Sequence, residues 1–193
     1  AEGIRSRRNR VGILDGFRKK KAGDYSPEFR AQPLSRGQAT MGTYDVGQNI
    51  GDCYNVLDIR GGPGRSGMGI VYVCRDQRVA GKIVALKTLQ ERFLSDQAAV
   101  DGFKREAEVW IRLGWHHNIV NAIGIELIQR RPYIVLEFVG GITSYGPSLS
   151  GWIWQGALRE SGSPNIPLIL NFSLQFCHGM MHAQEMFRKM GKP

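Results

Sequence analysis

The stretch GGPGRSGMGIVY at residues 61–72, together with VALK at residues 84–87, decides the fold class. The first is a glycine-rich connection that leads into an apolar run typical of a β-strand. In the second, strand alternation places Lys87 on the same face as Ala85 and Ile83. Because no helical pattern separates the two runs, we expect them to pair in an antiparallel sheet.

A glycine-rich connection between two strands can bind polyphosphate. Without side chains its backbone approaches phosphate closely, and its N–H groups can point at the oxygens. Glycine accounts for 25 of the 193 residues, and a tight hairpin would also use it, so the loop alone does not distinguish the two uses. Lys87 favours phosphate binding, because a Lys near the end of a buried strand destabilises the fold unless it pairs with an anion.

Residues 96–113 have the apolar periodicity of an amphipathic helix, with Ser95 as the expected N-cap. Glu106 falls inside the apolar arc of this helix, next to Trp110. A carboxylate there is expected to pair with a cation, and Lys87 is the natural partner. The alternative is that Glu106 marks the edge of the arc and reaches solvent.

Five strands and three helices are expected after residue 50, where the composition changes. On the last helix, apolar side chains are spaced to form one buried face, part of which stays exposed without a covering element. The expected strands are 54–59, 70–74, 82–89, 121–128 and 133–139, the other helices are 149–158 and 166–190, and the apolar face of the last helix carries Phe172, Phe176, Met180 and Phe187.

Composition excludes several classes of protein. Hydrophobic residues make up 42% and charged residues 22%, which is typical of a globular domain. No apolar run is long enough to span a membrane, and no apolar core follows the basic N-terminus, so we expect neither membrane insertion nor secretion. An odd number of scattered cysteines (Cys53, Cys74 and Cys177) favours a reducing, cytoplasmic location. His178 and His182 lack a third ligand, so no metal site is expected.

The net charge of +9 is concentrated near the N-terminus. Residues 1–40 hold ten Lys or Arg against four Asp or Glu, and like charges resist compaction. We therefore interpret residues 1–50 as a basic, flexible extension. Binding of nucleic acid or an acidic partner remains the alternative, although no aromatic platform accompanies the charge.

Several motifs in order along the chain resemble the small lobe of protein Ser/Thr kinases of bacterial type, over about residues 50–193. The resemblance implies an α+β fold. Residues 51–139 would form an ATP-binding small lobe, a five-stranded antiparallel sheet with one packed helix. Residues 140–193 would form the hinge and first helices of a truncated large lobe. Besides the glycine-rich loop and VALK, the motifs are FKREA at 103–107, LGWHHNIV at 113–120 and PYIVLEFV at 132–139.

The resemblance also implies the functional residues. Lys87 would contact the α- and β-phosphates of ATP and pair with Glu106 as the catalytic pair. Leu136 falls at the gatekeeper position, and the backbones of Glu137 and Val139 would bind the adenine edge. The other implied nucleotide-binding residues are Gly62, Gly64, Gly67, Gly69, Val71 and Ala85.

Two departures from the family pattern stand out. When the chain is aligned with the family on Val71, Ser66 stands where the second loop glycine is expected. A literal G-x-G-x-x-G motif is instead formed by Gly62, Gly64 and Gly67, which would shift the register of the loop relative to the strands. The motifs H-R-D-x-x-x-x-N and D-F-G, which supply the base and the magnesium ligands, are expected only beyond Pro193. We therefore expect this chain to bind ATP without transferring phosphate. Its partners would be a protein substrate and the missing C-terminal kinase lobe. The alternative function is a non-catalytic nucleotide-sensing or scaffold module.

Overall fold

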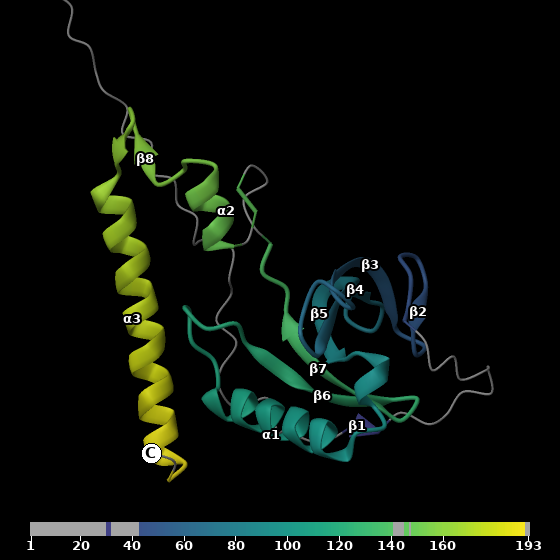
Figure 1. Cartoon of the computed structure of the whole chain (residues 1–193). Coiled ribbons are helices and arrows are strands. Elements are labelled where there is room, and N and C mark those ends of the chain that lie inside the picture. The colour runs from purple at the N-terminus through teal and green to yellow at the C-terminus, as the bar shows by residue number, and fades with distance from the viewer. Residues whose placement is uncertain (1–29, 32–42, 141–144, 147, 192–193) are drawn as a thin grey trace, which may run out of the picture.

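The computed structural model describes residues 30–31, 43–140, 145–146 and 148–191. Most of the basic extension predicted at residues 1–50 therefore lies outside the described residues. Within them, the chain forms a seven-stranded sheet, a short hairpin and three α-helices (Figure 1). The strands of the sheet are β1 (Arg30–Ala31), β2 (Asn49–Ile50), β3 (Tyr54–Gly61), β4 (Gly69–Asp76), β5 (Lys82–Leu89), β6 (Ala122–Ile128) and β7 (Arg131–Glu137).

The sheet has the order β1-β6-β7-β5-β4-β3-β2. Its neighbours from β3 to β7 are all antiparallel, which confirms the five predicted strands and their pairing. Two strands of two residues extend this sheet at its edges: β2 pairs antiparallel with β3, and β1 pairs parallel with β6. Such short strands show no alternation, so the sequence did not indicate them.

The hydrophobic core begins before residue 51. Tyr44 and Ile50 are both buried in a cluster with residues of β3 to β7, although the composition placed them in the extension. The Tyr44 N–H donates to the hydroxyl of Tyr72 at 3.3 Å, and the Tyr44 hydroxyl donates to Gln129 at 2.9 Å. These hydrogen bonds join the segment before β2 to β4 and to the turn between β6 and β7.

β6 and β7 are joined by a two-residue turn. Gln129 and Arg130 both have positive φ, 50° and 67°, as a tight hairpin between twisted strands requires. β7 therefore begins at Arg131, two residues earlier than predicted.

Helix α1 (Gln97–Leu113) packs against the sheet through the predicted apolar stripe. Phe103 and Ala107 are buried in one cluster with residues of β5 and β7. The N-cap is Asp96, not the predicted Ser95. The Asp96 carboxylate accepts hydrogen bonds from the N–H groups of the second and third helical residues, at 2.9 and 3.2 Å. Asp96 is the extended residue directly before the helix, so Ser95 lies one residue too early to cap it.

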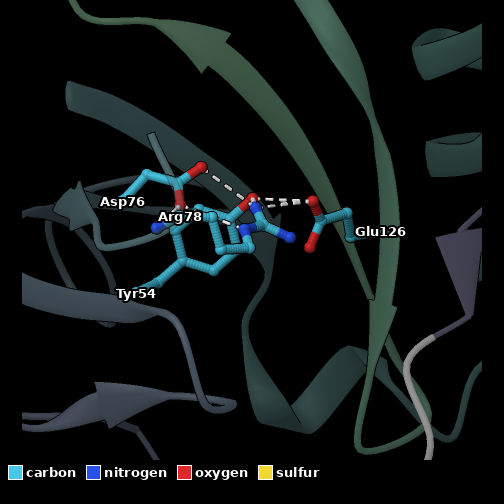
Figure 2. Close-up of polar contacts among 4 residues, drawn as sticks. All are labelled: Tyr54, Asp76, Arg78 and Glu126. Atoms are coloured by element: carbon cyan, nitrogen blue, oxygen red, sulfur yellow. Dashed lines mark hydrogen bonds and ion pairs between the residues drawn. The ribbon is translucent and has the colours of Figure 1, made fainter. Parts of the chain in front are cut away.

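The sheet is curled, so strands that are far apart in its order meet. Tyr54 of β3 donates from its hydroxyl to Glu126 of β6 at 2.7 Å, although three strands separate them in the sheet. Arg78, in the turn after β4, lies between them (Figure 2). Its guanidinium lies 3.0 Å from Glu126 and from Asp76, and it also donates to the Tyr54 hydroxyl. Burial, with the Glu126 hydrogen bond, raises the pKa of Tyr54 and keeps it a neutral donor.

The remaining elements lie C-terminal to the sheet. α2 is shorter than the predicted 149–158, because the chain turns at Gly156, whose φ is 71°. Of the helices formed by the described residues, none has the length and hydropathy needed to cross a membrane. These elements are α2 (Leu149–Trp154), the hairpin of β8 (Arg159–Glu160) and β9 (Ser163–Pro164), and α3 (Ile166–Lys189).

Helix α3 lies beside one end of α1 (Figure 1). Gly179 is the buried residue of this helix, and a Cβ there would lie 3.0 Å from the carbonyl oxygen of Asn118. The prediction that Phe176 and Met180 are buried is wrong: they are 67% and 54% exposed. Phe172, on the same face of α3, packs on Trp152 of α2, with 5.3 Å between the ring centres.

Candidate functional site

The predicted pair of Lys87 and Glu106 forms between β5 and α1. The Lys87 Nζ atom lies 2.5 Å from Glu106 Oε1 and 5.3 Å from the centre of the Trp110 ring. The side chains are 25% and 50% exposed, so the pair is only partly buried. Because α1 packs through Phe103 and Ala107, Glu106 lies at the edge of the interface. Glu106 therefore both pairs with Lys87 and contacts solvent, although the sequence analysis treated these as alternatives.

The glycine-rich loop between β3 and β4 lies next to this pair. A Cβ built on Gly69 would lie 3.8 Å from the Cε atom of Lys87, which places the end of the loop against the lysine side chain. Gly62 and Gly64 have φ of 97° and 72°, a region that side chains disfavour. Gly67 has open space where a Cβ would stand. The space around Gly64 and Gly67 is therefore open, and the C-terminal end of the loop at Gly69 lies against Lys87.

A pocket of about 230 Å³ lies between β4, β5 and the end of β7. In the register of the sheet, Ala85 is the partner of both Val73 and Leu136, and Lys87 is the partner of Val71. The volume is below the ~300 Å³ of the smallest drug-sized ligand pockets, which suits a flat base better than a whole nucleotide. Five predicted residues line it: Val71, Ala85, Leu136, Glu137 and Val139.

Several predicted residues do not line this pocket. The pair of Lys87 and Glu106 lies outside the pocket lining, and so do the glycines of the loop. Lys87 adjoins the pocket through its register partner Val71, and its side chain contacts the loop at Gly69. The site thus has two parts, an apolar slot and an adjoining cationic region beneath the loop.

The sequence reasoning missed some lining residues. Val73 shares a face of β4 with Val71, so simple alternation could have indicated it. Arg60 is the register partner of Val71 and also lines the pocket. Its Nε atom lies 2.6 Å from Asp58, and this contact lowers the pKa of the Asp58 carboxyl. The position of Arg60 at the pocket could be inferred only from the register of β3 on β4. The remaining lining residues are Val120 and Phe138.

The edge of the pocket is formed by the chain that leaves β7. Asn121 holds Glu137 in place twice: the Glu137 N–H donates to the Asn121 carbonyl at 3.0 Å, and the Glu137 carboxylate accepts from the Asn121 N–H at 2.9 Å. Among the described residues, the Val139 N–H finds no hydrogen-bond partner. A donor is therefore available at the pocket edge for a heterocyclic ligand.

Metal ligands do not gather in the described part of the chain. No group of three His, Cys, Asp or Glu there could hold a metal ion. His182 instead hydrogen-bonds the carbonyl oxygen of Leu113 at 2.7 Å and stacks on His116, with 4.6 Å between the ring centres. These contacts join α3 to the end of α1.

Comparison with known proteins agrees with this geometry. Residues 62–187 match the family model described as protein tyrosine and serine/threonine kinase, and this chain belongs to that family. It is 28% identical over 146 residues to the probable serine/threonine-protein kinase PknB of Lactococcus lactis, covering 76% of this chain and 20% of that protein. With the probable serine/threonine-protein kinase PknB of Bifidobacterium longum it shares 34% identity over 111 residues, 53% of this chain and 14% of that protein.

The fold comparison gives the same result. The crystal structure of the PknI kinase domain of Mycobacterium tuberculosis superposes with a TM-score of 0.51 at 22% identity, covering 74% of this chain and 51% of that chain. The α+β kinase fold and the homology to Ser/Thr kinases are thus confirmed. The chain spans a fifth or less of the two kinases named above, and about half of that kinase domain.

Proposed function

We propose that this chain is the ATP-binding portion of a protein Ser/Thr kinase, which transfers the γ-phosphate of ATP to protein hydroxyls. The observation that carries the proposal is the 2.5 Å ion pair of Lys87 and Glu106 beside a base-sized apolar pocket. Phosphoryl transfer depends on positioning and charge neutralisation, and this pair supplies a fixed cation for the phosphates.

In this proposal the adenine ring occupies the pocket. Val71 and Ala85 contact one face of the ring, and Leu136 closes the inner end. The backbones of Glu137 and Val139 hydrogen-bond the ring edge. Lys87, held by Glu106, contacts the α- and β-phosphates, and the flap above them is formed by Gly62, Gly64, Gly67 and Gly69.

Magnesium would neutralise the phosphates when it is bound. As the family pattern implies, we assign the magnesium ligands and the catalytic base to the C-terminal kinase lobe, beyond Pro193. On this proposal the chain alone binds ATP without phosphoryl transfer. That lobe and a protein substrate are its partners, and the odd number of cysteines scattered along the sequence favours a cytoplasmic location.

A thermal-shift titration tests the proposal, because a ligand that binds only the folded state raises the melting temperature. We expect a rise with Mg·ATP and a smaller one with adenosine. No rise with Mg·ATP at millimolar concentration would contradict nucleotide binding. Binding without phosphoryl transfer, in a protein that carries the C-terminal lobe, would favour the non-catalytic nucleotide-sensing module instead.

A further inference from the structure

Ser66, which takes the place of the second loop glycine when the chain is aligned on Val71, joins the two ends of the glycine-rich loop. Its hydroxyl accepts a hydrogen bond from the Gly62 N–H at 3.0 Å and donates to the Gly69 carbonyl at 2.5 Å. A glycine at this position could make neither bond. The replacement therefore adds a cross-link to the loop.

Gln90, the residue after β5, hydrogen-bonds the backbone of the same loop. It is 2% exposed, and its backbone N–H donates to the Met68 carbonyl at 2.8 Å. Its Nε2 atom lies 3.2–3.3 Å from three carbonyl oxygens, those of Ser66, Gly67 and Gly69. Gln90 thus fastens successive peptide groups of the loop to the end of β5.

This fastening fixes the direction of the loop N–H groups. In a trans peptide the C=O of one residue points opposite to the N–H of the next. The carbonyls of Ser66 and Gly67 face Gln90, so the N–H groups of Gly67 and Met68 face away from it. Within the described residues these two N–H groups have no hydrogen-bond partner. They are donors of the kind that bind phosphate oxygens.

Packing alone does not explain a glutamine at this position. The Gln90 Oε1 atom is buried and has no hydrogen-bond partner among the described residues. A buried acceptor without a partner destabilises the fold, and an apolar side chain would avoid that cost. The residue therefore matters for what its amide donates to the loop.

We propose that Ser66 and Gln90 are positioning residues, which hold the glycine-rich loop with its N–H groups ready for the phosphates of the bound nucleotide. This inference rests on the proposed ATP site. It predicts that loosening the loop weakens phosphate binding specifically, because the loop must then be ordered when ATP binds. Binding of the base in the apolar pocket stays unchanged.

The test uses the 193-residue chain and two variants, Gln90→Met and Ser66→Ala. The first keeps the buried volume and removes the donors, and the second removes only an exposed hydroxyl and so leaves folding intact. Gln97→Met, on the exposed start of α1, is the matched control. Dissociation constants for Mg·ATP and for adenosine are measured by calorimetry, and loop mobility by amide hydrogen exchange of a peptide covering 62–69.

We expect both variants to weaken Mg·ATP binding about three- to tenfold, the effect of losing one or two hydrogen bonds. Adenosine affinity should stay within twofold, exchange in the loop should be faster, and the control should match the wild type. An unchanged or increased Mg·ATP affinity in both variants, with the wild type binding both ligands, would overturn this inference alone. A wild-type chain that binds neither ligand would overturn the proposed function, and this inference with it.

Discussion

The Nζ atom of Lys87 lies 2.5 Å from Oε1 of Glu106, in an ion pair whose carboxylate side chain is half exposed to solvent. Ion pairs with this exposure contribute about 1 kcal/mol or less to stability, because water screens the charges. The fold therefore does not depend on this pair. What the pair does is hold an ammonium group next to the glycine-rich loop and the apolar pocket.

Replacing Lys87 by Met should consequently separate binding from folding. We expect the unfolding free energy to change by less than about 1 kcal/mol. Affinity for Mg·ATP should fall about tenfold or more, since hydrogen bonds to charged groups contribute about 1.5–3 kcal/mol. Glu106→Ala should act in the same direction. In a protein that carries the C-terminal lobe, both changes should abolish phosphoryl transfer.

Calorimetry with Mg·ATP and urea unfolding provide the two measurements. Lys82→Met, at the exposed start of the same strand, is the control and should bind ATP like the wild type. Unchanged ATP affinity in Lys87→Met would show that Lys87 does not contact the nucleotide.

The sequence predicted those parts of the site that depend on one local pattern at a time. Alternation along β5 placed Lys87 on the pocket face, and helical periodicity placed Glu106 on the sheet side of α1. The parts it missed depend on contacts between distant segments. Arg60 reaches the pocket through the register of β3 on β4, and Gln90 meets the loop because β5 ends beneath it. Neither relation leaves a periodic signal in the sequence.

The start of α1 shows a second kind of limit. Ser95 and Asp96 are adjacent, and both residue types cap helices well, so composition could not distinguish them. The structure gives the role to Asp96, whose carboxylate accepts two backbone hydrogen bonds. We expect Asp96→Ala to lower the unfolding free energy by about 1 kcal/mol, within the ~0.5–2 kcal/mol range for lost caps. Ser95→Ala should change it by less than about 0.5 kcal/mol. Urea unfolding of the two variants checks this, and the reverse order would contradict it.

Arg78 is expected to be a major stabiliser of the curled sheet. Its guanidinium neutralises two carboxylates that are nearly buried, with side-chain exposures of 8% for Asp76 and 11% for Glu126. Arg78→Met would remove the cation that lies beside both carboxylates. Because the Arg78 side chain is itself 37% exposed, we expect a loss of about 2 kcal/mol, below the ~3–5 kcal/mol for a fully buried pair.

The chain provides a matched control for this prediction. Arg60→Met breaks an exposed Arg–Asp pair of similar geometry, in which the side chains are 57% and 46% exposed. That variant should lose less than about 1 kcal/mol. Equal losses in urea unfolding for Arg60→Met and Arg78→Met would show that the network does not stabilise the curled sheet.

The contact between α1 and α3 should weaken in acid. Burial, together with the nearby His182, His117 and His178, lowers the pKa of His116. Its Nδ1 atom accepts a hydrogen bond from the Asn118 N–H at 3.2 Å, which requires that nitrogen to be unprotonated. Protonation would remove this bond and add charge beside the stacked His182.

The sign of the effect on folding follows from the direction of this shift. The folded protein binds the His116 proton less tightly than the unfolded chain, whose His pKa is about 6.5. The stabilising contribution is therefore complete above about pH 6.5 and is lost as the pH falls through the folded pKa. We expect the unfolding free energy to decrease between pH 7.5 and pH 5.5, and His116→Gln to reduce that slope. His178→Gln, on an exposed position of α3, should have a smaller effect on the slope. If His116→Gln kept the full wild-type pH dependence, another group would have to be responsible for it.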